Sequence, residues 1–132
     1  MKRALVTGAG KRLGRAMALY LAERGHDVAV HYATSAGAAE EVVGLIKAKG
    51  RNAQAIQADL LELDDMEGLL PQAAKSLGGP ITCLVNNASV FEYDTIATAS
   101  RDSWDRHINS NLRAPFVLSQ AMVAQGLTAT TD

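Results

Sequence analysis

The sequence predicts an α/β protein built on a doubly wound parallel sheet. Three observations lead to this prediction. Short apolar runs alternate with longer stretches of helical period along the whole chain. The first run, RALVT at residues 3–7, is continuously apolar at its centre, as in a strand that is buried on both faces. A glycine-rich segment, TGAGKRLGRA at residues 7–16, separates this run from the first helical stretch.

Each predicted element ends at a glycine or a polar turn. Strands are expected at residues 3–7, 27–32, 53–60 and 81–88, and helices at 12–24, 36–49, 64–77 and 101–124. The first helix has Leu13, Met17 and Leu21 at four-residue spacing, and Gly25 follows as its stop signal. Residues 1–125 are therefore expected to form one domain. The segment GLTATTD at residues 126–132 has neither period, and we expect a disordered or aberrant tail there.

Composition narrows the possible partners and compartments. The chain has 132 residues and a net charge of -1, which gives no electrostatic argument for a nucleic-acid partner. Its apolar runs are too short to cross a membrane, and its first residues do not resemble a signal peptide, so a cytoplasmic location is predicted. The single Cys83 lies in an apolar run and is expected to be a buried thiol. No metal site is predicted.

The glycine-rich segment predicts a nucleotide site. It follows the first strand and opens the first helix, where unpaired backbone N–H groups and the helix dipole favour an anion. Glycine at positions 8, 10 and 14 would let a pyrophosphate approach the backbone closely. The alternative is an ordinary strand-to-helix turn. The alternation of strands and helices favours the nucleotide site, because ligands of such sheets bind at the carboxyl ends of the strands.

The end of the second predicted strand favours NADP(H) as the nucleotide. NAD sites usually place an acid there to bind the ribose 2′-hydroxyl, whereas this strand ends VHYATS and the next acid is Glu40. Lys11 and Arg12 supply positive charge nearby, and Thr34 or Ser35 can donate hydrogen bonds to a 2′-phosphate. Alternatively, the two basic residues are only solvated charges at the start of a helix.

Four motifs in order resemble the short-chain dehydrogenase/reductase family. They are TGAGKRLG at 7–14, ADL at 58–60, NNAS at 86–89 and INSNLRAPF at 108–116, and the resemblance covers residues 2 to about 124. Arg12 stands where the family motif has its middle glycine, which is similar to pteridine-reductase-like members. The resemblance implies the cofactor-binding half of a Rossmann-type fold, with strand order 3-2-1-4. It also implies an NADP(H)-dependent oxidoreductase that reduces a carbonyl or a pterin-like C=N bond.

The resemblance implies roles for individual residues. Asp59 would bind the adenine amino group beside the Leu60 backbone, although it could be only a strand-end turn residue. Asn87 and Ala88 would line the cofactor; alternatively, the Asn side chains only tie strand ends together, and the two roles are compatible. Phe91 would stack on a pterin ring, or serve as a core or rim aromatic. The expected cofactor-binding set is Gly8, Lys11, Arg12, Leu13, Gly14, Thr34, Ser35, Asp59, Leu60, Asn87, Ala88 and Ser89.

Asn111 is the one catalytic residue expected from the resemblance, through a backbone carbonyl that helps build a proton relay. The sequence offers a separate reason, because Pro115 has no N–H to donate to the carbonyl of residue 111. A kink in the helix and a freed carbonyl are therefore predicted. The alternative is a bend that serves packing only.

The catalytic Ser and Tyr-x-x-x-Lys of the family have no counterpart here. Tyr20, Tyr32 and Tyr93 are not followed by a lysine four residues later. Two interpretations remain: a reductase whose sequence is truncated or frame-shifted near Gly126, or a nucleotide-binding module without catalysis. A small-molecule substrate and a homo-oligomer are expected. An open edge at strand 81–88 and an apolar surface along the last helix favour self-association; that surface comprises Trp104, Ile108, Leu112, Phe116 and Val123.

Overall fold

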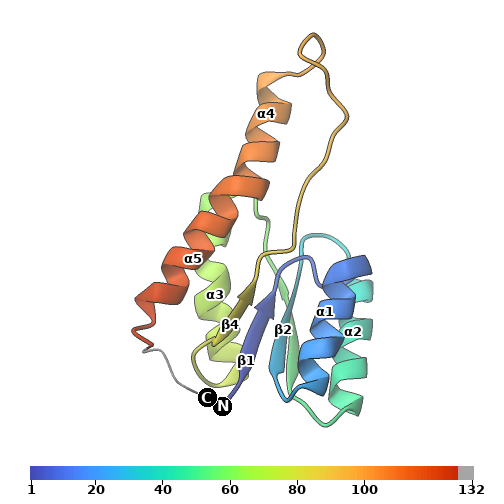
Figure 1. Cartoon of the computed structure of the whole chain (residues 1–132), viewed down its shortest axis with the longest axis vertical. Helices are drawn as coiled ribbons and strands as arrows, with labels where there is room; N and C mark the ends of the chain where they lie inside the picture. Colours follow the sequence, from blue (N-terminus) through green and yellow to red (C-terminus); the bar gives the residue numbers. More distant parts are fainter. Residues whose placement is uncertain (128–132) are drawn as a thin grey trace.

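The sheet has four parallel strands, and numbered along the chain they pair in the predicted order 3-2-1-4. The computed structural model describes residues 1–127. The strands are β1 (Arg3–Val6), β2 (Asp27–Tyr32), β3 (Ala53–Gln57) and β4 (Cys83–Val85). Their carboxyl ends meet at one edge of the sheet, which is the upper edge in Figure 1.

Helices cover both faces of this sheet. They are α1 (Arg12–Glu23), α2 (Ala36–Ala48), α3 (Leu63–Leu77), α4 (Arg101–Ile108) and α5 (Ala114–Ala124), with the π-helical segment η1 (Asn109–Arg113) between the last two. Helices α1 and α2 pack on one face and α3 and α5 on the other (Figure 1). Successive strand residues point to opposite faces, so Leu5 enters the α3–α5 core while Val6 enters the α1–α2 core. The continuous apolar run of the first strand thus serves two cores.

β3 and β4 are shorter than predicted. At their carboxyl ends, backbone N–H groups bond to side chains instead of to a neighbouring strand. β3 was expected to reach residue 60, but Asp59 Oδ1 accepts the Leu61 N–H at 2.9 Å and turns the chain. β4 was expected at 81–88 and spans only three residues. Beyond it, the Thr7 hydroxyl oxygen accepts the N–H groups of Asn87 and Ala88 at 3.0 and 2.9 Å.

The predicted long last helix is interrupted where Pro115 suggested a distortion. Between α4 and α5 the chain makes a wide π turn over η1, in which the Ala114 N–H bonds the Asn109 carbonyl five residues earlier. Pro115 has no N–H, so the regular helical bond to the Asn111 carbonyl cannot form. The predicted departure from a regular helix is confirmed, and a free Asn111 carbonyl stays a prediction.

Helix α5 ends at Ala124, and Gly126 shortly beyond it adopts a left-handed conformation with φ +71°. The expected tail beyond residue 127 lies outside the described residues. Within residues 1–127, no helix has the length and apolar character needed to cross a bilayer.

Candidate cofactor-binding site

The amino end of α1 is open and carries unpaired backbone donors. The first helical bond runs from the Arg15 N–H to the Lys11 carbonyl, so the N–H groups of the preceding residues have no helical acceptor. No side chain caps this end, and no acidic residue lies in its first turn. By contrast, α4 begins with a complete capping box in which Ser100 and Ser103 bond each other. The positive end of the α1 dipole is therefore available to an anion.

Two glycines shape the loop in front of this helix. Gly8 has φ +61°, and a Cβ there would lie 3.1 Å from the Ala88 Cα. A Cβ on Gly14 would collide with the Gly8 carbonyl oxygen. Gly14 is therefore required by the packing of the loop on its own helix.

Arg12 adopts φ +52° and is the only non-glycine residue among 1–127 with a left-handed backbone. This conformation explains why a glycine is suited to the position, because an L-residue there is strained by roughly 1–2 kcal/mol. Retention of a charged residue in a strained conformation is typical of a functional site. Neither Lys11 nor Arg12 forms an ion pair with any side chain in residues 1–127, and both are exposed.

Three adjoining recesses bring together all twelve predicted cofactor-binding residues. The largest, about 470 Å³, lies at the open end of α1 and is lined by Gly8, Lys11, Arg12, Leu13, Gly14, Ala33, Asn87, Ala88 and Ser89. The second, about 150 Å³, contains Asp59 and Leu60 and shares Ala33, Ala88 and Ser89 with the first. The third, also about 150 Å³, contains Thr34 and Ser35 and shares Gly8, Lys11 and Ala33. Ala33 lines all three, and sequence reasoning missed it because an alanine carries no chemical signal.

Asp59 forms the turn at the end of β3, which is one of the two roles that the sequence left open. One carboxylate oxygen, Oδ1, is bonded to the Leu61 N–H, so the residue stabilises the turn after β3. Its backbone N–H donates to Asp65 Oδ2 at 2.7 Å, which anchors this turn to the first turn of α3. Within residues 1–127, its Oδ2 has no hydrogen-bond partner and can accept from an amino group in the recess.

Phe91 lies on the segment after β4 and Asn111 lies in η1. Neither residue lines the three recesses, although their neighbours Val90 and Ser110 line the second one. Asn111 Oδ1 accepts the Val90 N–H and its Nδ2 donates to the Val90 carbonyl, both at 2.8 Å. The Glu92 N–H donates to His107 Nε2 at 2.9 Å, and Arg106 forms a bidentate pair with the Glu92 carboxylate. Hydrogen bonding to Arg106 lowers the pKa of Glu92. Phe91 sits between these two fixed residues with 84% of its surface exposed, so it is not a core aromatic.

Two supporting side chains were not identified from the sequence. Thr7 holds the segment after β4, since its hydroxyl accepts the N–H groups of Asn87 and Ala88. His31 is buried in β2 and bonds the Gly8 N–H. Both residues look like ordinary strand positions in the sequence, and only the distance between strands reveals their contacts.

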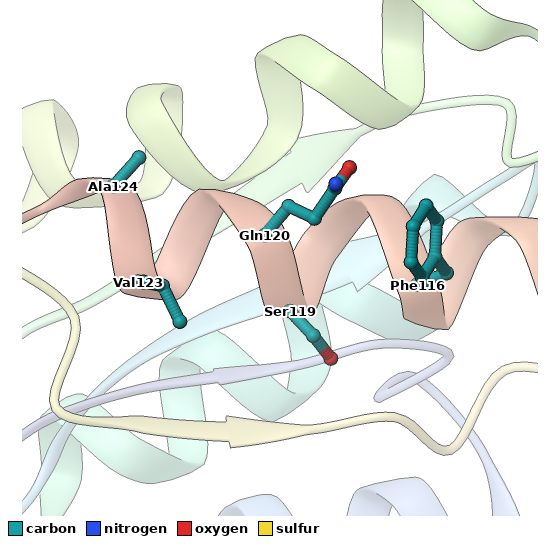
Figure 2. Close-up of a pocket in the computed structure, with 5 residues that line it drawn as sticks. All are labelled: Phe116, Ser119, Gln120, Val123 and Ala124. Carbon is teal, nitrogen blue, oxygen red and sulfur yellow. The ribbon is translucent and has the colours of Figure 1, made fainter.

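A separate apolar recess lies on α5, remote from the glycine-rich loop. All five residues that line it project from this one helix (Figure 2): Phe116, Ser119, Gln120, Val123 and Ala124. The predicted apolar surface is exposed here, with Phe116 at 61% and Val123 at 81%. Together with Trp104, Ile108 and Leu112, we call these two residues the α4–α5 apolar surface.

The model of the short chain dehydrogenase family matches residues 2–130. The chain belongs to this family. The chain is similar to the 3-oxoacyl-acyl-carrier-protein reductase FabG of Staphylococcus aureus, with 40% identity over 126 residues. That match covers 96% of this chain and 51% of FabG. The chain therefore spans about half the length of the curated relatives it matches.

Solved structures agree with the fold and the family. A short chain dehydrogenase from Burkholderia cenocepacia in complex with NADP gives a TM-score of 0.89 at 41% identity, covering 93% of this chain and 50% of that one. The FolM alternative dihydrofolate reductase 1 of Brucella suis in complex with NADP gives 0.90 at 37% identity, covering 99% and 53%. The family and the fold implied by the four motifs are thus confirmed. The pteridine-reductase-like subgroup is not specifically supported, because the similar proteins include a FabG as well as a FolM.

Proposed function

We propose that this chain is the cofactor-binding part of an NADP(H)-dependent oxidoreductase of the short chain dehydrogenase family. The observation that carries the proposal is the uncapped amino end of α1 facing a recess lined by the glycine-rich loop and the strand ends. The donor set suits a dinucleotide, because the helix end offers backbone N–H groups to a pyrophosphate. In support, the cited Burkholderia and Brucella relatives were solved with NADP.

Each part of the cofactor has a group suited to it. The N–H groups at the start of α1 would bind the pyrophosphate, and Asp59 would accept from the adenine amino group. Lys11, Arg12, Thr34 and Ser35 would hold the 2′-phosphate through charge-assisted hydrogen bonds. Asn87, Ala88 and Ser89 would line the path toward the nicotinamide, which supplies hydride transfer when bound.

Thermal unfolding with NADPH tests this proposal. The midpoint should rise with the logarithm of NADPH concentration, because a ligand that binds only the folded state stabilises it by mass action. Lys11→Gln should reduce the rise, whereas Lys75→Gln removes the same charge from an exposed position on α3 and should leave it unchanged. A midpoint that does not respond to millimolar NADPH would contradict the proposal.

We propose further that the whole protein reduces a carbonyl or a pterin-like C=N bond of a small-molecule substrate. The FabG relative supports the carbonyl and the FolM relative supports the pterin. Asn111 would take part through its backbone carbonyl, and its side chain would position the segment that carries Phe91. A cytoplasmic location stays a prediction.

Phe91 and Tyr93 form a matched pair for testing the pterin substrate. Both are aromatic, both are 84% exposed, and they lie two residues apart. If Phe91 stacks on a pterin, Phe91→Ala should weaken dihydropterin binding to the NADPH-saturated chain about tenfold, and Tyr93→Ala should not. Equal effects, or none, would contradict the stacking role and leave the carbonyl as the favoured substrate.

The second candidate is a nucleotide-binding module without catalysis. Its nucleotide would bind in the same recess at the open end of α1, without turnover. The intact mass of the protein isolated from its source separates the two candidates. A mass well above 14.0 kDa would support the reductase, and a mass of 14.0 kDa would support the module.

A further inference from the structure

We propose that His31 is a positioning residue for cofactor binding, which fixes the glycine-rich loop to the turn after β3 through its two ring nitrogens. The inference rests on the proposed function, because it concerns the site where NADP(H) would bind. His31 lies near the carboxyl end of β2, between β1 and β3 in the sheet. It does not line any of the three recesses, so it would act through the backbone of its neighbours.

The ring makes one hydrogen bond in each direction across the sheet. The Gly8 N–H donates to His31 Nδ1 at 2.9 Å, and His31 Nε2 lies 2.9 Å from the Ala58 carbonyl oxygen. Because Nδ1 accepts a hydrogen bond, it carries no hydrogen in the neutral ring, so Nε2 carries the ring N–H and donates a hydrogen bond to the Ala58 carbonyl. The two backbone groups therefore select one neutral tautomer. The residue is 2% exposed, so water cannot replace either partner.

These two contacts join the segments that bind opposite ends of the expected ligand. Gly8 begins the glycine-rich loop, and Ala58 immediately precedes Asp59, which faces the second recess. The backbone of β2 repeats the link, since the Ala9 N–H bonds the His31 carbonyl and the Ala58 N–H bonds the Tyr32 carbonyl. The ring adds the one bond that Gly8 itself makes to β2. It thereby holds the left-handed Gly8 in place beneath the open end of α1.

Protonation of the ring would remove this support. A charged imidazole carries N–H groups at both nitrogens, so it would direct a donor at the Gly8 N–H. Burial lowers the pKa of His31, and the Ala58 carbonyl opposes this shift. The groups that face the ring are the backbone N–H of Gly8 and the carbonyl of Ala58. The nearest ionisable side chains on those two segments are Lys11 and Asp59, and neither contributes to the pKa shift.

Two amide substitutions separate the two ring contacts. In His31→Asn the side-chain oxygen lies close to the position of Nδ1 and can still accept from Gly8. In His31→Gln the amide nitrogen reaches the position of Nε2 and can still donate to Ala58, but the Gly8 N–H loses its acceptor. Calorimetric titration with NADPH at pH 7.5 should give an affinity for the Asn variant close to that of the wild type. The Gln variant should bind about tenfold more weakly, as expected for an unsatisfied backbone donor.

The pH dependence of NADPH affinity distinguishes a positioning role of His31 from a purely structural one. Because burial lowers the pKa of His31 below its ordinary value of 6.5, the wild type should begin to lose NADPH affinity to ring protonation only below that pH, and His31→Asn should lose less because its amide does not titrate. Equal affinity losses in the two variants, no loss in either, or identical pH profiles for wild type and His31→Asn would overturn the proposal.

Hydrogen exchange of the Gly8 amide, measured without any cofactor, tests the role of His31 independently of whether the chain binds NADPH. The amide should be protected in the wild type and in His31→Asn, and should exchange at least several-fold faster in His31→Gln. If the wild type does not bind NADPH but the exchange pattern holds, the proposed function fails and the role of His31 in fixing the loop stands. If the exchange pattern fails, the positioning role is overturned whatever the affinity.

Discussion

Arg12 combines a strained backbone with an exposed charge that lines the recess at the open end of α1. An L-residue in the left-handed region costs roughly 1–2 kcal/mol, which glycine avoids. The strain is compatible with folding because the flanking β1 and α1 are well packed. Because the Arg12 side chain is exposed, we attribute the presence of arginine at this strained position to its charge.

Arg12→Gly should therefore separate stability from cofactor binding. Relief of strain is offset by the greater freedom of glycine in the unfolded chain, so the free energy of unfolding should change by less than about 1 kcal/mol. Loss of a charge-assisted contact to a 2′-phosphate should weaken NADPH binding about tenfold or more and leave NADH binding unchanged. Denaturant unfolding and calorimetry measure the two effects. Equal weakening of both cofactors would contradict a role at the 2′-phosphate.

Gly14 gives a prediction of the opposite kind, because its missing Cβ is required by packing. In Gly14→Ala the new methyl would collide with the Gly8 carbonyl oxygen, and the loop must shift. Overpacking of this kind should lower the free energy of unfolding by about 1–3 kcal/mol. Gly44→Ala is the matched control, since a Cβ there meets nothing within 4 Å inside α2, and it should raise stability by up to about 1 kcal/mol. Similar effects of the two substitutions on urea unfolding would show that the loop tolerates the shift.

At the scale of elements, η1 holds the segment after β4 in place. The Asn111 side chain makes two hydrogen bonds to Val90, and Arg106 and His107 of α4 bind Glu92. These contacts order a stretch that has no regular secondary structure between β4 and α4. Together, α4 and η1 thus hold the residues that follow β4 in place.

Asn111→Ala should release this support. Loss of two exposed hydrogen bonds should cost about 1–2 kcal/mol of stability and increase hydrogen exchange at the Val90 amide. Asn109→Ala is the matched control in the same π-helical segment, because no hydrogen bond of the Asn109 side chain is found within residues 1–127. If the Val90 amide exchanges equally fast in both variants, the Asn111 side chain does not hold the segment.

The elements were predictable from the sequence to the extent that their signals are local. Glycine stops and four-residue apolar spacing placed α1 within one residue of its observed end, and the absent N–H of Pro115 predicted the irregular turn before α5. The early end of β3 uses a local contact of the Asp59 carboxylate with Leu61, and a turn at Asp59 was one of the alternatives that the sequence left open. The early end of β4 could not be predicted, because it depends on the Thr7 hydroxyl, which lies far away along the chain. The roles of His31 and Ala33 also depend on contacts between strands.

At the scale of the whole molecule, β4 is an edge strand of the described sheet. Just before this strand, the backbone of Ile81 already has hydrogen-bond partners. Its N–H donates to the Gln125 side chain at 2.8 Å, and its carbonyl accepts from the same side chain at 3.0 Å. The strand itself has no further strand beside it within residues 1–127. An open edge and the α4–α5 apolar surface are both features that favour contact with another chain.

The 132-residue chain should therefore associate with itself in solution. Light scattering at micromolar concentration should report a mass above 14.0 kDa that increases with concentration. Phe116→Glu should reduce this association if α5 contributes to the contact, because the substitution places a charge at the centre of the apolar surface. A stable, monodisperse monomer of the unmodified chain would contradict this prediction.

The central claim is that the recess at the open end of α1 binds NADP(H) through groups that recognise the 2′-phosphate. Calorimetric titration of the chain with NADPH and with NADH tests it most directly. A charge-assisted contact contributes about 1.5–3 kcal/mol, so NADPH should bind roughly tenfold to a hundredfold more tightly than NADH. Equal affinities, or a preference for NADH, would contradict the account.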